Sequence, residues 1–139
     1  LTKGRMLQNI MVSLGGRIAE EIIFGDITTG ASSDIKKATK VARRMVTRYG
    51  MTENIGVICY DDDDDEVFIG RDLAHAKSHS EIVAGDIDRG VKSIIDDCYA
   101  KAKKIILEHE GVLHKCAELL LEKEKIGREE FEALFAQKA

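Results

Sequence analysis

The sequence predicts a mainly α-helical domain of about five helices with one small β-hairpin. Apolar residues recur every three or four positions along most of the 139 residues, which is the spacing of one helix face. Proline is absent, so long helices meet no obligatory break. The composition, with 44% hydrophobic and 33% charged residues, is ordinary for a globular domain. With only four Phe, three Tyr and no Trp, its core must be aliphatic.

The first helix is predicted over residues 3–24, where the apolar positions form a single stripe. Gly25 is a typical C-terminal stop. Gly15 and Gly16 lie in the middle of this helix, where each costs about 1 kcal/mol relative to Ala. We therefore expect the pair to permit the close approach of a neighbouring backbone. The stripe consists of Leu7, Ile10, Met11, Leu14, Ile18 and Ile22.

A tight link rich in Thr, Ser and Gly is predicted over residues 26–33, followed by a second helix that runs to about residue 49. Ser32 or Ser33 can accept backbone N–H bonds at the start of this helix. Asp34 suits the positive end of the helix dipole. The predicted buried stripe of the second helix is Ile35, Ala38, Ala42, Met45 and Tyr49.

A two-stranded hairpin is predicted from residues 56–60 and 67–70, which are short and rich in β-prone residues. The acidic residues 61–66 would form its loop. The run Asp61 to Asp65 resembles a cation site in composition, but consecutive side chains of an extended segment point to opposite faces and converge poorly on one ion. A solvated loop is the better interpretation.

Three further helices are predicted over residues 80–108, 110–123 and 128–137, each from the apolar spacing of one helix face. Ser80 is the candidate cap of the first of these. In the longest helix we expect Ile87, Val91, Ile94, Ile95, Cys98, Ala102 and Ile105 to face inward. No internal repeat or composition shift divides the chain, so a single domain is expected.

Charge and cysteine content exclude several classes of protein. The formal net charge is −4, with Lys and Arg dispersed among carboxylates, which argues against a nucleic-acid binder. Three cysteines without a CxxC spacing do not form a disulfide framework, so a reducing compartment fits better. No run of about 18 apolar residues provides a membrane span within the chain. The chain begins at Leu1 rather than Met, which suggests a fragment or a processed product.

The histidines offer no complete site for metal-assisted hydrolysis. Zinc peptidases of the HExxH type carry two histidines one helical turn apart with a glutamate as general base, and this motif is absent from the sequence. His109 and His114 are five residues apart, which rotates them by about 140° on a helix. His75 and His79 have the required spacing, but Ala76 stands where the base would be. This second pair is a possible transition-metal site, although exposed polar residues are the better interpretation.

Two motifs connect the chain to a known family. The first is Leu-Gly-Gly-Arg-Ile-Ala-Glu-Glu-Ile-Ile-Phe-Gly at residues 14–25, and the second is Thr-Thr-Gly-Ala-Ser-Ser-Asp-Ile at residues 28–35. In this order they resemble the second half of the peptidase domain of the FtsH family, membrane-anchored ATP-dependent zinc metalloproteases that combine an AAA ATPase with a protease. The resemblance extends over nearly the whole chain. It implies that residues 1–139 are the C-terminal portion of the peptidase domain, without its HExxH helix and ATPase domain.

The resemblance also implies roles for two carboxylates. Asp34 matches the family's third zinc ligand, which completes the two HExxH histidines; considered alone, it is an ordinary carboxylate at a helix start. The family often has Asn before this Asp, whereas Ser33 stands here. Glu20 matches a position that faces the same region, where a carboxylate can orient a ligating imidazole. Because Glu20 and Glu21 point about 100° apart on a helix, we expect one of them to be solvated.

For the intact protein the resemblance implies a homohexamer in the bacterial inner membrane, with this domain facing the cytoplasm. Its ATPase domain would use ATP and Mg²⁺ to feed unfolded or membrane proteins to the protease, and zinc would activate the attacking water. The present chain alone is expected to be inactive and to bind zinc weakly, because one carboxylate supplies too little of a tetrahedral site. The alternative is a non-catalytic helical module for oligomerisation or docking in an inactive family member.

Overall fold

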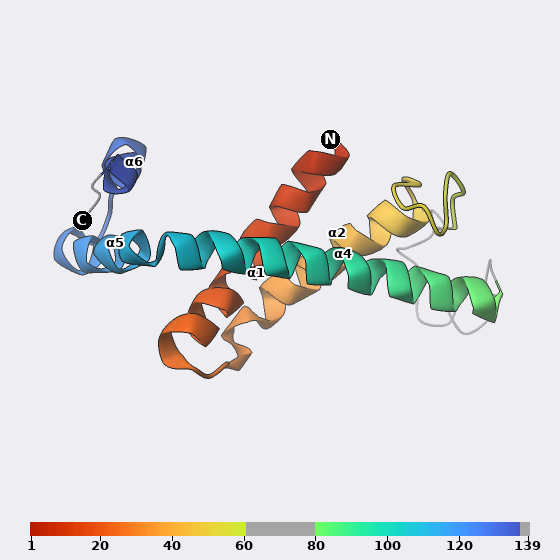
Figure 1. Cartoon of the computed structure of the whole chain (residues 1–139), viewed down its shortest axis with the longest axis horizontal. Coiled ribbons are helices and arrows are strands. Elements are labelled where there is room, and N and C mark those ends of the chain that lie inside the picture. Colours follow the sequence, from red (N-terminus) through yellow and green to blue (C-terminus); the bar gives the residue numbers. More distant parts are fainter. Residues whose placement is uncertain (61–79, 137–139) are drawn as a thin grey trace, which may run out of the picture.

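A computed structural model describes residues 1–60 and 80–136 of the chain, and the mainly helical prediction is confirmed. The described residues form five α-helices and one 3-10 turn (Figure 1). Each α-helix begins and ends within two residues of its predicted bounds. The elements are α1 (Lys3–Phe24), η1 (Thr29–Ala31), α2 (Ser32–Thr47), α4 (Glu81–Glu108), α5 (Glu110–Lys123) and α6 (Arg128–Ala136). None of the described helices is long and apolar enough to cross a membrane.

Helices α1 and α4 begin and end as the sequence predicts. The Thr2 hydroxyl accepts the Arg5 N–H at 3.1 Å at the start of α1. Gly25 ends α1 in the left-handed conformation, with φ of 64°, and donates its N–H to the Glu21 carbonyl. The Ser80 hydroxyl accepts the Val83 N–H at 3.2 Å and caps α4. These local contacts satisfy N–H and C=O groups that a helix end leaves free.

The start of α2 differs from the prediction. Neither Ser32 nor Ser33 caps this helix; the capping position is Ala31, which makes no side-chain hydrogen bond there. The reason is that η1 leads directly into α2, and the Ser32 N–H already donates to the Thr29 carbonyl. The side-chain cap lies earlier, at Thr28, whose hydroxyl accepts the Gly30 N–H. The link between α1 and α2 is therefore more ordered than a simple turn.

The predicted hairpin is not found among the described residues. Residues 56–60 form no strand, and residues 67–70 lie outside the described residues. Gly56 adopts a left-handed conformation and donates its N–H to the Thr52 carbonyl at 2.8 Å, which closes a local turn. The Tyr60 N–H then donates to the Thr47 carbonyl at 2.7 Å, at the end of α2. These contacts use backbone groups that a strand pair would need.

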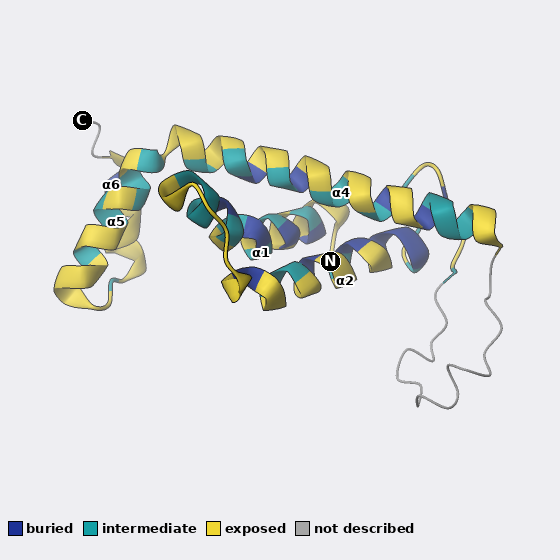
Figure 2. Cartoon of the chain, turned by 90° about the horizontal axis from the view of Figure 1, so that it is seen from below, coloured by how far each residue is buried: buried dark blue, intermediate teal, exposed yellow. Residues whose placement is uncertain are grey.

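The core lies where α4 crosses α1 and α2, which are on the same side of it (Figure 2). Ile10, Ile18 and Met45 are fully buried there. Helices α2 and α4 approach closely at Gly90, where an added Cβ would lie 3.2 Å from a methyl group of Val46. The main cluster of buried residues is Met6, Ile10, Leu14, Ile18, Ala38, Ala42, Met45, Cys98 and Ala102.

Some residues predicted to be buried are exposed. Tyr49 lies beyond the end of α2 and is 48% exposed, because the helix ends at Thr47. Ile105 in the last turns of α4 is 50% exposed. For Gly15 and Gly16, no described atom outside the neighbouring helix backbone lies within 4 Å of an added Cβ. The close approach expected at this glycine pair is therefore absent among the described residues.

Helices α5 and α6 form a separate projection at the end of α4, which we call the distal hairpin (Figure 1). Helix α5 contains no buried residue, and α6 buries Leu134. The two helices are joined by an ion pair between Lys123 and Glu130 at 2.8 Å. At its base, the Phe135 ring packs edge-on against the ring of His109.

Candidate functional site

Asp34, the residue predicted as a ligand, lies in the first turn of α2. It is half-buried. Within the described part of the chain, its carboxylate makes no hydrogen bond or ion pair, so its oxygens are available to a ligand. The helix start also favours a negative charge at this position, because the unpaired N–H groups of the first turn carry partial positive charge.

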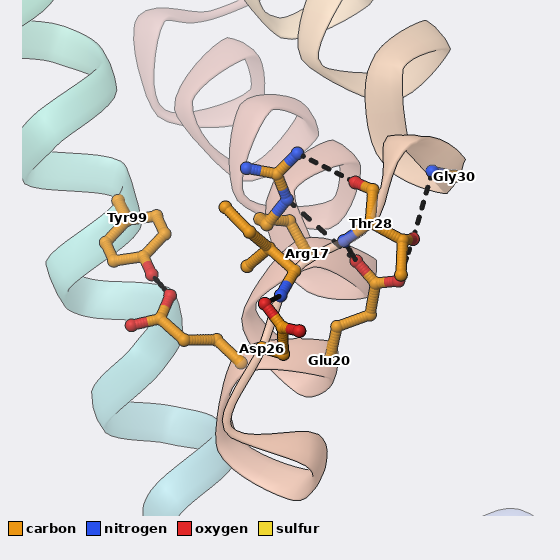
Figure 3. A network of polar contacts seen from close by, with 8 residues as sticks. Arg17, Glu20, Asp26, Thr28, Gly30 and Tyr99 are labelled. Carbon is orange, nitrogen blue, oxygen red and sulfur yellow. Dashed lines mark hydrogen bonds and ion pairs between the residues drawn. The ribbon is translucent and has the colours of Figure 1, made fainter.

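Four residues connect the α1–α2 link to α1, and we call them the link brace: Arg17, Glu20, Thr28 and Gly30 (Figure 3). The Thr28 hydroxyl donates to Glu20 Oε2 at 2.5 Å, and the Thr28 N–H donates to Oε1 at 3.5 Å. Arg17 Nη2 donates to the Thr28 carbonyl at 3.2 Å. Gly30 donates its N–H to Thr28 Oγ1 at 3.1 Å. Glu20 therefore contacts the segment that leads to Asp34.

Arg17 and Glu20 form the part of the link brace that belongs to α1. Arg17 Nε lies 3.9 Å from Glu20 Oε1, and each side chain is 23% exposed. The Arg17 Nε atom is buried and has no hydrogen-bond partner among the described residues. The Glu20 carboxylate thus lies beside a positive charge that is partly shielded from water, which strengthens the attraction between them.

Glu21 has a different role from Glu20. Its carboxylate accepts a hydrogen bond from the Tyr99 hydroxyl of α4, on the opposite side of α1 from Thr28 (Figure 3). Lys103 Nζ lies 3.3 Å from the other Glu21 oxygen. Glu21 is the more solvated of the two glutamates, with a side chain that is 39% exposed against 23% for Glu20, although it also contacts α4.

Asp34 fits a zinc site as one ligand of several. A carboxylate oxygen is an ordinary zinc ligand, but protein zinc sites use three or four protein ligands. The described residues contain no group of three or more His, Cys, Asp or Glu side chains that could hold a metal ion. These residues therefore do not form a zinc site by themselves, and the remaining ligands would have to come from another segment.

The sequence offered further histidines and carboxylates as candidates, and of these only His109 and His114 are among the described residues. Asp61 to Asp65, His75 and His79 lie outside the described residues. His114 lies in the distal hairpin, with Nε2 at 3.7 Å from a carboxylate oxygen of Glu110 in the preceding turn. His109 and His114 are both exposed, at and just beyond the junction of α4 and α5.

Arg17 and Thr28 are site residues that the sequence did not identify. The available signal was the spacing of Arg17 and Glu20, which are three residues apart and therefore neighbours on one helix face. Together with Ile27, Ser32 and Ile35, Arg17 and Thr28 line an open depression beside the start of α2. Nothing in the sequence indicates which link residue would reach back to Glu20.

Comparisons with known proteins show what the chain is similar to. The model of peptidase family M41 matches residues 1–134. The ATP-dependent zinc metalloprotease FtsH of Caldicellulosiruptor bescii is 49% identical over 138 residues, covering 99% of this chain and 22% of that protein. The FtsH protein of Ruminiclostridium cellulolyticum is 50% identical over 134 residues, and that of Thermotoga maritima is 39% identical over 137 residues. The chain spans 22% of the length of each of these relatives.

Proposed function

The chain belongs to peptidase family M41, and from this premise we propose that residues 1–139 form the C-terminal portion of a zinc metallopeptidase domain. The HExxH helix and an AAA ATPase domain would then lie in parts of the protein outside this chain. The chain covers only 22% of the length of these relatives, which supports the proposal that the other parts lie outside it.

In this proposal Asp34 is the zinc ligand that the chain contributes. The observation that carries it is a half-buried carboxylate at a helix start without a partner among the described residues. Two histidines of an HExxH helix would complete the protein ligands. When bound, zinc supplies the means to lower the pKa of a coordinated water and so to generate a nucleophile at neutral pH.

Glu20 is proposed to orient one of the ligating imidazoles. A carboxylate has about four lone-pair directions. The Thr28 hydroxyl uses Oε2 at 2.5 Å, whereas the nearest polar atoms to Oε1 are more distant, at 3.5 Å for the Thr28 N and 3.9 Å for Arg17 Nε. Oε1 therefore retains capacity to accept an imidazole N–H. Such contacts fix the ring orientation of a metal-bound histidine.

For the whole protein we propose an ATP-dependent protease that assembles as a homohexamer and is anchored in the bacterial inner membrane, with this domain on the cytoplasmic side. Its substrates would be unfolded or membrane proteins, and its missing ATPase domain would bind ATP and Mg²⁺. The similarity to proteins named ATP-dependent zinc metalloprotease supports the protease and its energy source. The net charge of −4 supports protein rather than nucleic-acid substrates.

A second candidate is a non-catalytic helical module for oligomerisation or docking in an inactive family member. The absence of a three-ligand metal group from the described residues is compatible with both candidates. The two candidates differ in whether an HExxH motif precedes this chain in the intact protein.

The decisive experiment uses a longer chain that includes the upstream peptidase region. Bound zinc per chain and casein cleavage are measured for this protein, for Asp34→Asn, and for Asp88→Asn, which changes an exposed carboxylate of α4. We expect zinc binding and cleavage in the parent and in Asp88→Asn, and loss of both in Asp34→Asn. Retention of both in Asp34→Asn would exclude Asp34 as the ligand. A parent protein without HExxH or without bound metal would favour the helical module.

The isolated 139-residue chain provides a separate test of the division between segments. We expect it to cleave no casein and to bind zinc weakly, because it offers one ligand of the proposed set. Zinc affinity of about micromolar or better through Asp34 alone would contradict this expectation.

A further inference from the structure

We infer that Arg17 and Thr28 are positioning residues for Asp34: through the link brace they determine where α2 begins and therefore where its carboxylate lies. This inference depends on the proposed role of Asp34 as a metal ligand. It concerns residues other than the proposed ligand itself.

Thr28 is the centre of the link brace because each of its polar groups has a partner. Its hydroxyl both donates to Glu20 and accepts from the Gly30 N–H. Its backbone N–H points to Glu20, and its carbonyl accepts from Arg17. A hydroxyl that donates and accepts at the same time has a defined rotamer, so Thr28 is held in both position and orientation.

The path from Thr28 to Asp34 is short and has regular structure throughout. The Gly30 N–H bond to Thr28 begins η1, and the Ser32 N–H bond to the Thr29 carbonyl joins η1 to α2. Ala31, the last residue of η1, is only 5% exposed and is therefore on the buried side of this turn. Because the intervening residues are helical, a displacement of Thr28 is passed on to the backbone of Asp34.

Gly30 lies close against Thr28 and Glu20, although the link itself is exposed. A Cβ added at Gly30 would lie 3.3 Å from the Thr28 hydroxyl oxygen and 4.0 Å from a Glu20 oxygen. Metal–ligand distances in working sites vary by only about 0.2 Å. A shift of the α2 start by a fraction of an ångström is therefore enough to weaken a metal bond to Asp34.

The link brace is separate from the packing that stabilises the fold. Its two α1 side chains are each 23% exposed, whereas the core residues Ile18 and Met45 are fully buried. Loss of the Thr28 hydroxyl should therefore change the geometry at Asp34 while α1, α2 and α4 stay packed. A merely structural residue would lower stability and metal affinity together.

The test measures the zinc dissociation constant of the longer chain that contains the upstream peptidase region, by competition with a chromophoric chelator. Thr28→Val keeps the shape of the side chain and removes the hydroxyl. Thr28→Ser keeps the hydroxyl, and Thr29→Val changes the neighbouring exposed threonine as a matched control. A second readout is amide hydrogen exchange of residues 28–34 in the metal-free protein, with the urea unfolding midpoint recorded for each variant.

We expect Thr28→Val to weaken zinc binding by about tenfold, the low end of the range for loss of a direct outer partner of a metal ligand, because Thr28 acts on Asp34 through the backbone. Exchange at residues 28–34 should rise while the urea midpoint stays near that of the parent. Thr28→Ser should restore affinity to within a few-fold, and Thr29→Val should bind zinc like the parent. Arg17→Met keeps the aliphatic stem and should weaken binding in the same direction by a smaller factor, because one bond to Thr28 is lost.

Unchanged zinc affinity in both Thr28→Val and Arg17→Met would overturn the inference, as would equal losses in Thr28→Val and Thr29→Val. Thr28→Val could unfold the protein, and Thr28→Ser then provides the test. A folded Thr28→Ser protein that binds zinc as weakly as Arg17→Met does would overturn the inference, because the hydroxyl is still present. Asp34→Asn is measured in parallel. If Asp34→Asn loses zinc and the Thr28 and Arg17 variants do not, only the positioning role is contradicted. If Asp34→Asn binds zinc like the parent, both the proposed ligand and the positioning role are contradicted.

Discussion

The packed region of α1, α2 and α4 and the distal hairpin are both helical, but they bury very different amounts of apolar surface. Ile10 and Met45 in the packed region are fully buried, whereas α5 buries no residue and its Leu120 is 40% exposed. Both regions were predicted from the same apolar spacing. The difference shows that this spacing identifies the apolar face of a helix but does not identify what covers that face.

The largest contrast should appear when a large apolar side chain is shortened in each region. Ile10→Ala should lower the free energy of unfolding by about 3 kcal/mol, because it leaves a cavity among fully buried residues. Leu121→Ala in α5 should change it by less than about 0.5 kcal/mol, because that side chain is 86% exposed. Urea unfolding followed by circular dichroism measures both. Similar losses in the two variants would mean that α5 is covered as well as α1.

A second test asks whether the distal hairpin opens independently. Leu134 is 6% exposed, and Leu134→Ala should lower the free energy of unfolding of α5 and α6 by about 2 kcal/mol. Burial raises the pKa of the Cys98 thiol in α4, so little reactive thiolate is present there. In Leu134→Ala, labelling with a thiol reagent should be faster than in the parent at Cys116, which lies in α5, and unchanged at Cys98, which lies in α4.

The comparison includes a control within the same assay. Ala133 is exposed and precedes Leu134 in α6. Ala133→Gly should accelerate the labelling of Cys116 less than Leu134→Ala does, because it removes helix preference but no buried side chain. Equal acceleration at Cys98 and Cys116 in Leu134→Ala would show that the two regions unfold as one unit.

Gly16 provides a smaller effect of opposite sign within the packed region. Gly16→Ala should stabilise the isolated chain by up to about 1 kcal/mol, because helix preference is gained and no described atom beyond the nearby helix backbone lies within 4 Å of the added methyl. Gly90→Ala is the matched substitution at a crowded position, 3.2 Å from Val46, and should destabilise instead. Thermal unfolding of both variants measures the sign, and destabilisation by Gly16→Ala would reveal an unrecognised neighbour.

The smallest effect concerns the exposed ion pair of the distal hairpin. The hydrogen bond from Lys123 and then its charge lower the pKa of Glu130 below 4.5, and the same contact raises the pKa of Lys123 above 10.5. The Glu130 contribution to stability is therefore present above pH 4.5 and is lost as the pH falls through its lowered pKa. The Lys123 contribution is present below pH 10.5 and is lost as the pH rises through its raised pKa.

Carboxyl titration followed by NMR tests this pair. Lys123→Met should return the Glu130 pKa toward 4.5, whereas Lys125→Met should leave it unchanged. High salt should shift the parent in the same direction as Lys123→Met, because exposed charges are screened. An unchanged Glu130 pKa in Lys123→Met would show that the pair is not formed in solution.

Helix bounds could be predicted here because they depend on local spacing, caps and glycine stops, as at Gly25 and Ser80. The start of α2 was predicted less well, because η1 supplies by backbone bonds what a serine cap would supply by a side chain. Asp34 and Glu20 were identified from the family resemblance. Thr28 was not identified, because its bond to Arg17 spans eleven residues across a link whose path local sequence does not determine.

The length of α4 has a mechanical consequence. At 1.5 Å per residue its 28 residues extend about 42 Å. Ala102 is the last buried residue along it, and the distal hairpin begins beyond Glu108. Helix α4 packs against α1 and α2 from Ile87 to Ile106, within one turn of its C-terminal end, and the distal hairpin projects beyond that contact. A small tilt of α4 against α1 and α2 would therefore displace the tip of the distal hairpin by more than it displaces the core.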